Sequence, residues 1–380
     1  MNMKHQSTYL FRDILERVEV PVNVEPDKEY VQIGIRSHGK GLFYKEPVLG
    51  KALGNKQVFW IQPNCFILNV VFAWEQAITK TTENEIGMIG SHRFPMYRPK
   101  NDLVDIDYLI YYFLTKRGTD ILEAASPGGA GRNRTLGQER FLKSKITLPP
   151  LPEQQKIAAI LSTQDKVIEL KEKLLALKQQ QKKYLMQQLL MPKNKEKSFK
   201  AIHLSDISCL INKHIDGQKY NYVSTENISP NLSGKVLFDE SNIEISGVGF
   251  NAGDILVGNI RPYLKKVWRA NKDGLCSTDV LVFRPIGISS EFLYYLIAND
   301  NFFFYVMTTA KGSKMPRGDK KAIMNAKMLI PESKIEQNFL VELLSTADHE
   351  IDLLQKSIEA EKQKKKALMQ LLLTGKVRVK

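Results

Sequence analysis

A chain of 380 residues is longer than one hydrophobic core usually serves, which predicts two domains, and a hydrophobic content of 43% indicates folded cores rather than disorder. The 55 Lys and Arg residues against 41 Asp and Glu give a net charge of +14, which favours a polyanionic partner, nucleic acid first, over a merely lysine-rich soluble protein. Three scattered cysteines (Cys65, Cys209, Cys276) suit neither zinc nor a disulfide framework, and neither a signal segment nor a membrane-spanning run is present, so we expect a cytoplasmic protein without membrane contact.

The first body, residues 1–148, has the pattern of mixed strands and helices. Apolar residues alternate over Gln57–Val71, and Gly, Asn and Pro interrupt the run. Near the start of this body, Arg36, His38 and Lys40 stand among glycines and are candidate DNA contacts. The segment from Gly34 also has the spacing of a phosphate-binding loop, but Gly41 stands where such a loop needs Ser or Thr, which argues against a nucleotide site.

Later in the first body, an aromatic segment precedes a loop of small residues. Tyr111 and Tyr112 follow Leu109-Ile110, which favours a core helix over a surface for stacking bases. The loop Ser126–Arg134 carries Arg132 and Arg134 between glycines, which let the backbone approach a ligand closely. Arginine can grip a phosphate or contact guanine, so both are candidate DNA contacts; pairing with local carboxylates is the competing interpretation.

A long amphipathic helix is expected to follow, over residues 149–192 and chiefly from Asp165 to Met191. Ser162-Thr163 and Asp165 can cap its start, and Pro192 ends it. The expected apolar stripe, which Ile168, Leu175, Leu185 and Leu189 widen, consists of Ile160, Val167, Leu170, Leu174, Leu177 and Tyr184. Residues 191–198 are charged and poor in apolar residues, as in a linker.

The second body, residues 193–330, has the same mixed pattern. Apolar runs at Ile255–Val257 and Leu281–Phe283 predict strands, and Tyr294-Tyr295 predicts a core helix. Two basic groups are candidate DNA contacts. The first comprises Arg261, Lys265 and Lys266, and the second, in a glycine-containing loop, comprises Lys311, Lys314 and Arg317.

The chain contains an internal repeat. The segment Glu153–Leu190 matches Glu336–Leu373 without a gap at an offset of 183 residues, and the same offset aligns Tyr111-Tyr112 with Tyr294-Tyr295 and Arg134 with Arg317. Residues 331–380 therefore predict a second long helix, capped near Ser345-Thr346 and ended at Gly375. Its expected stripe is Leu344, Ile351, Leu354, Ile358, Leu368 and Leu372.

One amphipathic helix of that length needs a partner, and the chain supplies one mate. An antiparallel two-helix coiled coil is the economical arrangement, and packing of each helix on its own body is the alternative. The predicted fold is therefore α+β, with two mixed α/β bodies joined by two long helices in a pseudo-twofold internal repeat.

Catalytic signatures are absent from the sequence. It has no Asn/Asp-Pro-Pro-aromatic motif for methyl transfer to a base, and no histidine pair of metal-hydrolase spacing. Three hypotheses remain open: a non-catalytic DNA-binding protein, a self-contained DNA enzyme such as a nuclease with a dispersed site, and a coiled-coil scaffold. Salt-dependent, sequence-selective DNA binding separates the first from the third.

The segment Leu148–Ile157, leading into a helix that ends Leu185-Met186-Gln187-Gln188-Leu189-Leu190, resembles the central repeat of type I restriction-modification specificity subunits. The second copy, closing at Leu371–Arg378, resembles the distal repeat of the same family. The chain departs from the family pattern in two places. The segment Ile330–Gln337 before the second long helix lacks the second proline-containing part that the first copy has. The first body has Asn64-Cys65-Phe66-Ile67-Leu68 where the second has Gly253-Asp254-Ile255-Leu256.

The resemblance implies two target-recognition domains, each reading half of a gapped double-stranded DNA site, and a coiled coil whose length sets the gap. It also implies two methyltransferase subunits docked on the helical repeats, with Glu153, Gln154, Glu336 and Gln337 as partner contacts, and restriction subunits with motor and nuclease activity. S-adenosylmethionine, ATP and Mg²⁺ would then belong to those partners, and this chain would hold no cofactor or metal and no catalytic residue.

Overall fold

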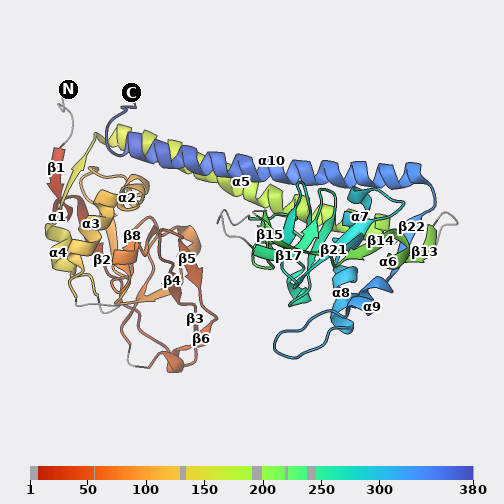
Figure 1. Ribbon diagram of the computed structural model, residues 1–380. Helices are drawn as coiled ribbons and strands as arrows, with labels where there is room; N and C mark the ends of the chain where they lie inside the picture. The colour runs from red at the N-terminus through yellow and green to blue at the C-terminus, as the bar shows by residue number, and fades with distance from the viewer. Residues whose placement is uncertain are drawn as a thin grey trace. The chain divides into compact units, whose positions relative to one another are not determined.

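The computed structural model describes residues 7–54, 56–128, 134–190, 199–218, 221–237 and 245–379. The linker expected over residues 191–198, including Pro192, lies outside them. The chain forms two compact units: unit 1 comprises Met1–Glu172 with Ser357–Lys380, and unit 2 comprises Lys173–Lys356. Each unit therefore combines one mixed body with one half of each long helix, α5 (Leu151–Leu190) and α10 (Lys334–Leu372) (Figure 1).

The body of unit 1 consists mainly of short strands, and most of its α-helices lie near its end, before a final strand. Its body contains, in chain order, β1 (Ser7–Leu10), α1 (Phe11–Ile14), β2 (Leu15–Val18), β3 (Glu29–Tyr30), β4 (Ile33–Ile35), β5 (Leu42–Tyr44), β6 (Val48–Leu49), η1 (Gly50–Leu53), β7 (Val58–Trp60), β8 (Phe66–Leu68), η2 (Ala73–Glu75), β9 (Ile78–Lys80), η3 (Glu83–Glu85), β10 (Ile89–Ser91), β11 (Met96–Pro99), α2 (Ile106–Phe113), α3 (Lys116–Ala125), α4 (Gln138–Lys143) and β12 (Lys145–Leu148).

A four-stranded antiparallel sheet of order β2-β11-β8-β9 organises this body. The rings of Phe11, Phe66, Phe113 and Phe141, all fully buried, pack together on it. Such aromatic clusters bury large apolar areas and fix the helices against the sheet. The expected mixed body with strands in Gln57–Val71 is confirmed by β7 and β8.

Unit 2 repeats this plan with different lengths. Its body contains β13 (Phe199–His203), α6 (Leu204–Ile207), β14 (Ser208–Ile211), β15 (His214–Gln218), β16 (Tyr222–Val223), β17 (Ile245–Phe250), β18 (Ile255–Gly258), η4 (Pro262–Leu264), β19 (Val267–Arg269), β20 (Gly274–Cys276), β21 (Val280–Pro285), α7 (Ser290–Ile297), α8 (Asp300–Thr308), α9 (Lys320–Met324) and β22 (Lys327–Pro331).

The sheet of unit 2 has the order β14-β21-β18-β19, which matches the order β2-β11-β8-β9 of unit 1 strand for strand. The terminal pairs match too, since β1 pairs with β12 and β13 with β22. The internal repeat therefore extends through bodies whose sequences have diverged. Strands β18 and β21 and the core helices α2 and α7 confirm the corresponding sequence predictions.

The predicted starts of the long helices were wrong. Helix α5 begins at Leu151 and α10 at Lys334, each about three turns before the first residue of its expected cap, Ser162 or Ser345. Ser162 and Thr163 both donate to the carbonyl of Ala159, and Thr346 donates to that of Glu342, so these hydroxyls bond back within a helix instead of capping it. The predicted end of α10 is confirmed, because Gly375 adopts a left-handed φ of +71° and its N–H bonds to Leu372.

Within each unit, α5 and α10 are antiparallel, as the ion pairs between them show. Lys171 and Glu172 of α5 contact Glu361 and Lys362 in unit 1. In unit 2, Lys178 contacts Glu350 and Lys182 contacts Asp348, so residue numbers rise along one helix as they fall along the other. The helices also pack on the bodies, since Leu372 and Leu373 join the core of unit 1 and Met186 and Leu190 that of unit 2.

The predicted apolar stripe of α5 was wrong in its main members. Leu170, Leu174, Leu177 and Tyr184 are between 44% and 62% exposed. Ile168 is buried and Leu175 half-buried, and the residues of α5 that contact α10 include the charged Lys171 and Lys182. The stripe expected on α10 is confirmed as buried or half-buried. A seam rich in ion pairs favours one register over slipped alternatives.

Glu361 gives the helix pair of unit 1 a pH dependence. Hydrogen bonds from Lys171 and Gln164 hold its pKa at about 2, below the ordinary value of 4.5. Because the folded-state pKa is depressed, this carboxylate contributes stability above pH 4.5 that is lost as the pH falls toward 2. We expect the wild-type chain to lose stability faster than Glu361→Gln over that interval, measured by thermal unfolding followed by circular dichroism. Equal slopes for the two proteins would contradict the assignment.

Candidate nucleic-acid interface

In unit 2, the structure brings Arg261 together with the loop Lys311–Arg317. Arg261 ends the segment after β18 with a left-handed φ of +51°, and its N–H donates to the carbonyl of Pro316 at 2.8 Å. Ile260 forms a β-bridge with Arg317, and Lys311 and Arg317 exchange two backbone hydrogen bonds of 2.9 Å. A positive φ at a residue with a side chain is unusual and marks a constrained turn. The turn and the loop therefore form one surface.

Two cations of this surface are paired with carboxylates. Arg317 Nε and Nη2 lie 2.9 and 3.2 Å from the two carboxylate oxygens of Asp279, and Lys311 Nζ lies 2.7 Å from Asp319. The bidentate contact with Asp279 raises the pKa of Arg317. Among the described residues, Arg261 and Lys314 make no ion pair, and both are exposed. The surface thus holds two free cations and two neutralised ones.

Lys265 and Lys266 contact groups of unit 2 outside the surface around Arg317. Lys265 Nζ lies 2.5 Å from Asp300, where Lys183 also binds, and both lysines lower the pKa of that carboxyl. Lys265 lines a cavity of about 1040 Å³ beside the end of α5. Lys266 Nζ donates to the backbone carbonyl of Thr225. Their part in DNA binding stays a prediction.

In unit 1, Arg36, His38 and Lys40 occupy the tip of the β4–β5 hairpin and are exposed. The guanidinium of Arg36 lies over the ring of Phe43 at 5.3 Å, and its Nη1 donates to the carbonyl of Leu42. His38 has a left-handed φ of +61°, and its N–H donates to the carbonyl of Glu75 at 2.8 Å. The hairpin tip therefore rests on η2.

Arg134 reaches the same turn. Its guanidinium lies over the ring of Trp74 in η2, 5.4 Å from the ring centroid. Arg132 lies outside the described residues. Because η2 joins β8 to β9 as η4 joins β18 to β19, the two bodies place their candidate residues on matching turns. The sequence missed Trp74, the half-exposed Tyr263 of η4 and Asp279, because only tertiary structure shows what they contact.

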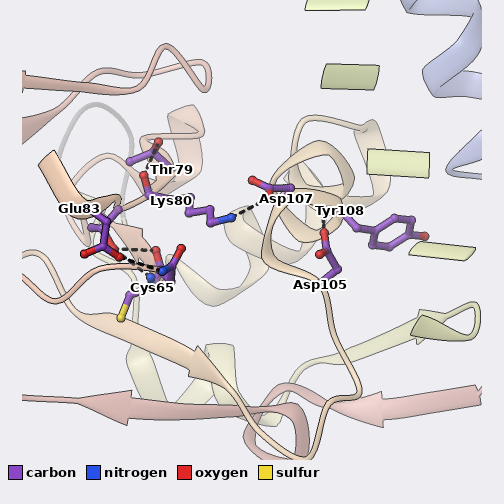
Figure 2. A network of polar contacts seen from close by, with 9 residues as sticks. Cys65, Thr79, Lys80, Glu83, Asp105, Asp107 and Tyr108 are labelled. Carbon is purple, nitrogen blue, oxygen red and sulfur yellow. Dashed lines mark hydrogen bonds and ion pairs between the residues drawn. The ribbon is translucent and has the colours of Figure 1, made fainter. Parts of the chain in front are cut away.

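Polar contacts connect the β8–β9 hairpin to α2 (Figure 2). Lys80 Nζ of β9 lies 2.7 Å from Asp107 of α2, and Asp105 caps α2 by accepting from the N–H of Tyr108 at 2.8 Å (Figure 2). Asn64 donates to Glu83 across the start of the hairpin. The cap stabilises the start of α2, and the ion pair between Lys80 and Asp107 fixes β9 relative to that helix.

The four residues expected to bind partner subunits are mostly buried. Glu153 accepts two hydrogen bonds from Arg378, and Gln154, which is fully buried, bonds three backbone groups within unit 1. Gln337 is 7% exposed and donates to the carbonyl of Pro331; Glu336 is exposed. Their described contacts are structural, and contact with a partner stays a prediction.

Two further classes of site are absent from the described residues. No helix among them is long and apolar enough to cross a membrane. Within the same part of the chain, no group of three or more His, Cys, Asp or Glu residues is placed to hold a metal ion.

Comparisons with known proteins agree with this picture. Residues 25–179 match the family model of the type I restriction modification DNA specificity domain. The chain is 26% identical over 321 residues to the type I restriction enzyme MjaVIII specificity subunit of Methanocaldococcus jannaschii, covering 74% of this chain and 72% of the relative.

Solved structures share the fold over nearly the whole chain. The HsdS subunit from Thermoanaerobacter tengcongensis has a TM-score of 0.53 at 15% identity, covering 99% of this chain and 98% of that one. The type I restriction-modification S subunit from M. genitalium has a TM-score of 0.60 at 13% identity, covering 98% and 97%. This chain therefore shares the duplicated fold of these subunits. By sequence, the chain is similar to the DNA specificity subunits of type I restriction-modification systems.

Proposed function

We propose that this chain recognises a bipartite, gapped site in double-stranded DNA, one half through each body, for a type I restriction-modification complex. The observation that carries the proposal is the matching surface of the two bodies, where the turn after the third strand of each sheet meets the loop that follows α3 or α8. The two bodies present different side chains on equivalent turns, which suits two different half-sites. The net charge of +14 supports salt-dependent affinity.

The proposed partners are two methyltransferase subunits and the restriction subunits of the same system. We propose that S-adenosylmethionine, ATP and Mg²⁺ act in those partners and that this chain contributes recognition alone. Cleavage or methylation of plasmid DNA by the purified chain, supplied with Mg²⁺ and S-adenosylmethionine but no other subunit, would contradict that division of labour.

Single arginine substitutions test the assignment of one half-site to each body. Arg134→Ala should weaken recognition of one half-site and Arg317→Ala that of the other, each by about tenfold, because each removes a charged contact from one body only. The measurement is competition binding of the full chain to duplexes with one half-site scrambled at a time. If both variants affect the same half, or neither affects any, the assignment is wrong.

A further inference from the structure

The described residues contain two buried side-chain polar atoms without a hydrogen-bond partner, the hydroxyl of Ser126 and Oδ1 of Asn259. Ser126 begins the small-residue loop of the first body, and Asn259 lies directly before Ile260 and Arg261 at the candidate interface of the second. Buried polar atoms are nearly always paired, and leaving one unpaired costs its full desolvation. Both exceptions lie at the surface assigned to DNA.

Comparison of the two bodies shows that the fold does not need an amide at position 259. The N–H of Asn259 donates to the carbonyl of Asp279, and its own carbonyl accepts from Gly318. In the first body, Val70 makes the equivalent pair of bonds, with Arg93 and Leu136, and its side chain belongs to the hydrophobic core. An apolar residue therefore fills this structural position in the first body, and the second body has an unpaired amide there instead.

Gly318, directly after the loop Lys311–Arg317, covers Asn259. A Cβ atom on Gly318 would lie 2.9 Å from Oδ1 of Asn259, so only glycine lets the backbone approach the amide this closely. Asn259 is 6% exposed under this cover. The cover is held at its edge by the ion pair between Arg317 and Asp279, whose side chains are 54% and 35% exposed. Exposed ion pairs are weak, and a DNA phosphate can compete for the arginine.

We propose that Asn259 reads an adenine in the half-site of the second body after a DNA phosphate draws Arg317 away from Asp279 and the loop lifts from the amide. The amide of asparagine matches the N6 donor and N7 acceptor of adenine in the major groove. The unpaired Oδ1 is then the acceptor that meets the N6 amino group. This inference rests on the proposed function, because it assigns one base contact within the site proposed above.

The test is selection of bound duplexes from a randomised pool by the full chain, wild type and Asn259→Val. Valine copies the residue of the first body, so the variant should fold with an equal or higher Tm. We expect one adenine position in one half-site to lose its preference by about tenfold, while the other half-site is unchanged. Asn259→Ala should give the same result, and Ser126→Ala, which removes the matching unpaired atom of the first body, should leave that position intact.

The outcomes separate this inference from the proposed function. If the wild-type chain selects no gapped sequence, the proposed function fails and the inference with it. If the wild type selects such a site and Asn259→Val retains every base preference at normal Tm, only the inference fails. A fall in Tm with loss of both half-sites, in Asn259→Val and Asn259→Ala alike, would assign Asn259 a structural role and overturn the inference.

Discussion

Replacing Gln154 with leucine should destabilise unit 1 by about 3 kcal/mol or more, since three buried backbone groups would each lose a partner at a cost of about 1–3 kcal/mol. The side chain accepts from the N–H of Asp105 at 3.0 Å and donates to the carbonyls of Leu103 and Pro149 at 3.0 and 2.8 Å. It thereby ties the start of α5 to the cap of α2. Urea unfolding of the full chain, with hydrogen exchange to locate the loss in unit 1, measures the effect.

The second copy of the repeat supplies the control. Gln337 occupies the equivalent position at the start of α10, but within the described part of the chain its side chain has one hydrogen bond, to the carbonyl of Pro331 at 2.8 Å. Gln337→Leu should therefore cost only about 1 kcal/mol, in unit 2. Equal losses for the two variants would show that the hydrogen bonds of Gln154 do not set its contribution.

Two substitutions at the interface of the second body should change DNA affinity in opposite directions. Arg261→Ala removes an exposed cation that has no ion-pair partner among the described residues, and should weaken binding about tenfold and reduce the salt slope by about 1. Asp279→Asn removes the carboxylate that neutralises Arg317, so it should strengthen binding and steepen the salt dependence. Fluorescence anisotropy with a labelled duplex, at a series of salt concentrations, measures both.

Lys362→Ala serves as the matched control for loss of one positive charge. Lys362 lies on α10 and pairs with Glu172 of α5, away from η4 and the loop Lys311–Arg317 in sequence and in contacts. Its substitution should leave the salt slope unchanged. If Lys362→Ala and Arg261→Ala weaken binding equally, net charge and not the position of Arg261 governs affinity.

The repeat in the sequence was sufficient to predict two mixed bodies and two long helices that pair. Two similar segments of one chain fold alike, and this inference needs no knowledge of which side chains are in contact. The seam of α5 could not be predicted in the same way. Leu170, Leu174 and Leu177 have helical spacing, yet they face outward, while Lys171 and Lys182 lie in the seam because α10 supplies Glu361 and Asp348 opposite them. Amphipathic patterns assume an apolar interface, but this one also contains several ion pairs between the two helices.

The candidate site shows the same limit. Glycine and arginine in one loop predicted the surface around Arg317, and the structure places Arg261 beside it. The sequence did not indicate that Asp279, which is remote along the chain, forms an ion pair with Arg317. It also did not indicate that Glu153 and Gln154 are buried and form hydrogen bonds within unit 1. The burial and ion pairing of a side chain depend on its neighbours in the folded protein, and a local sequence motif does not show which residues those are.

The two units share an aspartate-centred contact. Tyr111 donates to Asp165 at 2.8 Å and Tyr295 to Asp348 at 2.9 Å, which shifts the tyrosine alignment by one residue from the sequence offset. Lys365 and Lys182, each from the opposite long helix, complete these contacts, and each ammonium also lies over the ring of the tyrosine. If either helix shifted by one heptad, the lysine would leave both contacts. The aspartate and the tyrosine hydroxyl of each contact would then lose their positively charged partner. Each slipped alignment would thereby break two such contacts, so the two helices favour a single register even though several leucines of α5 are exposed.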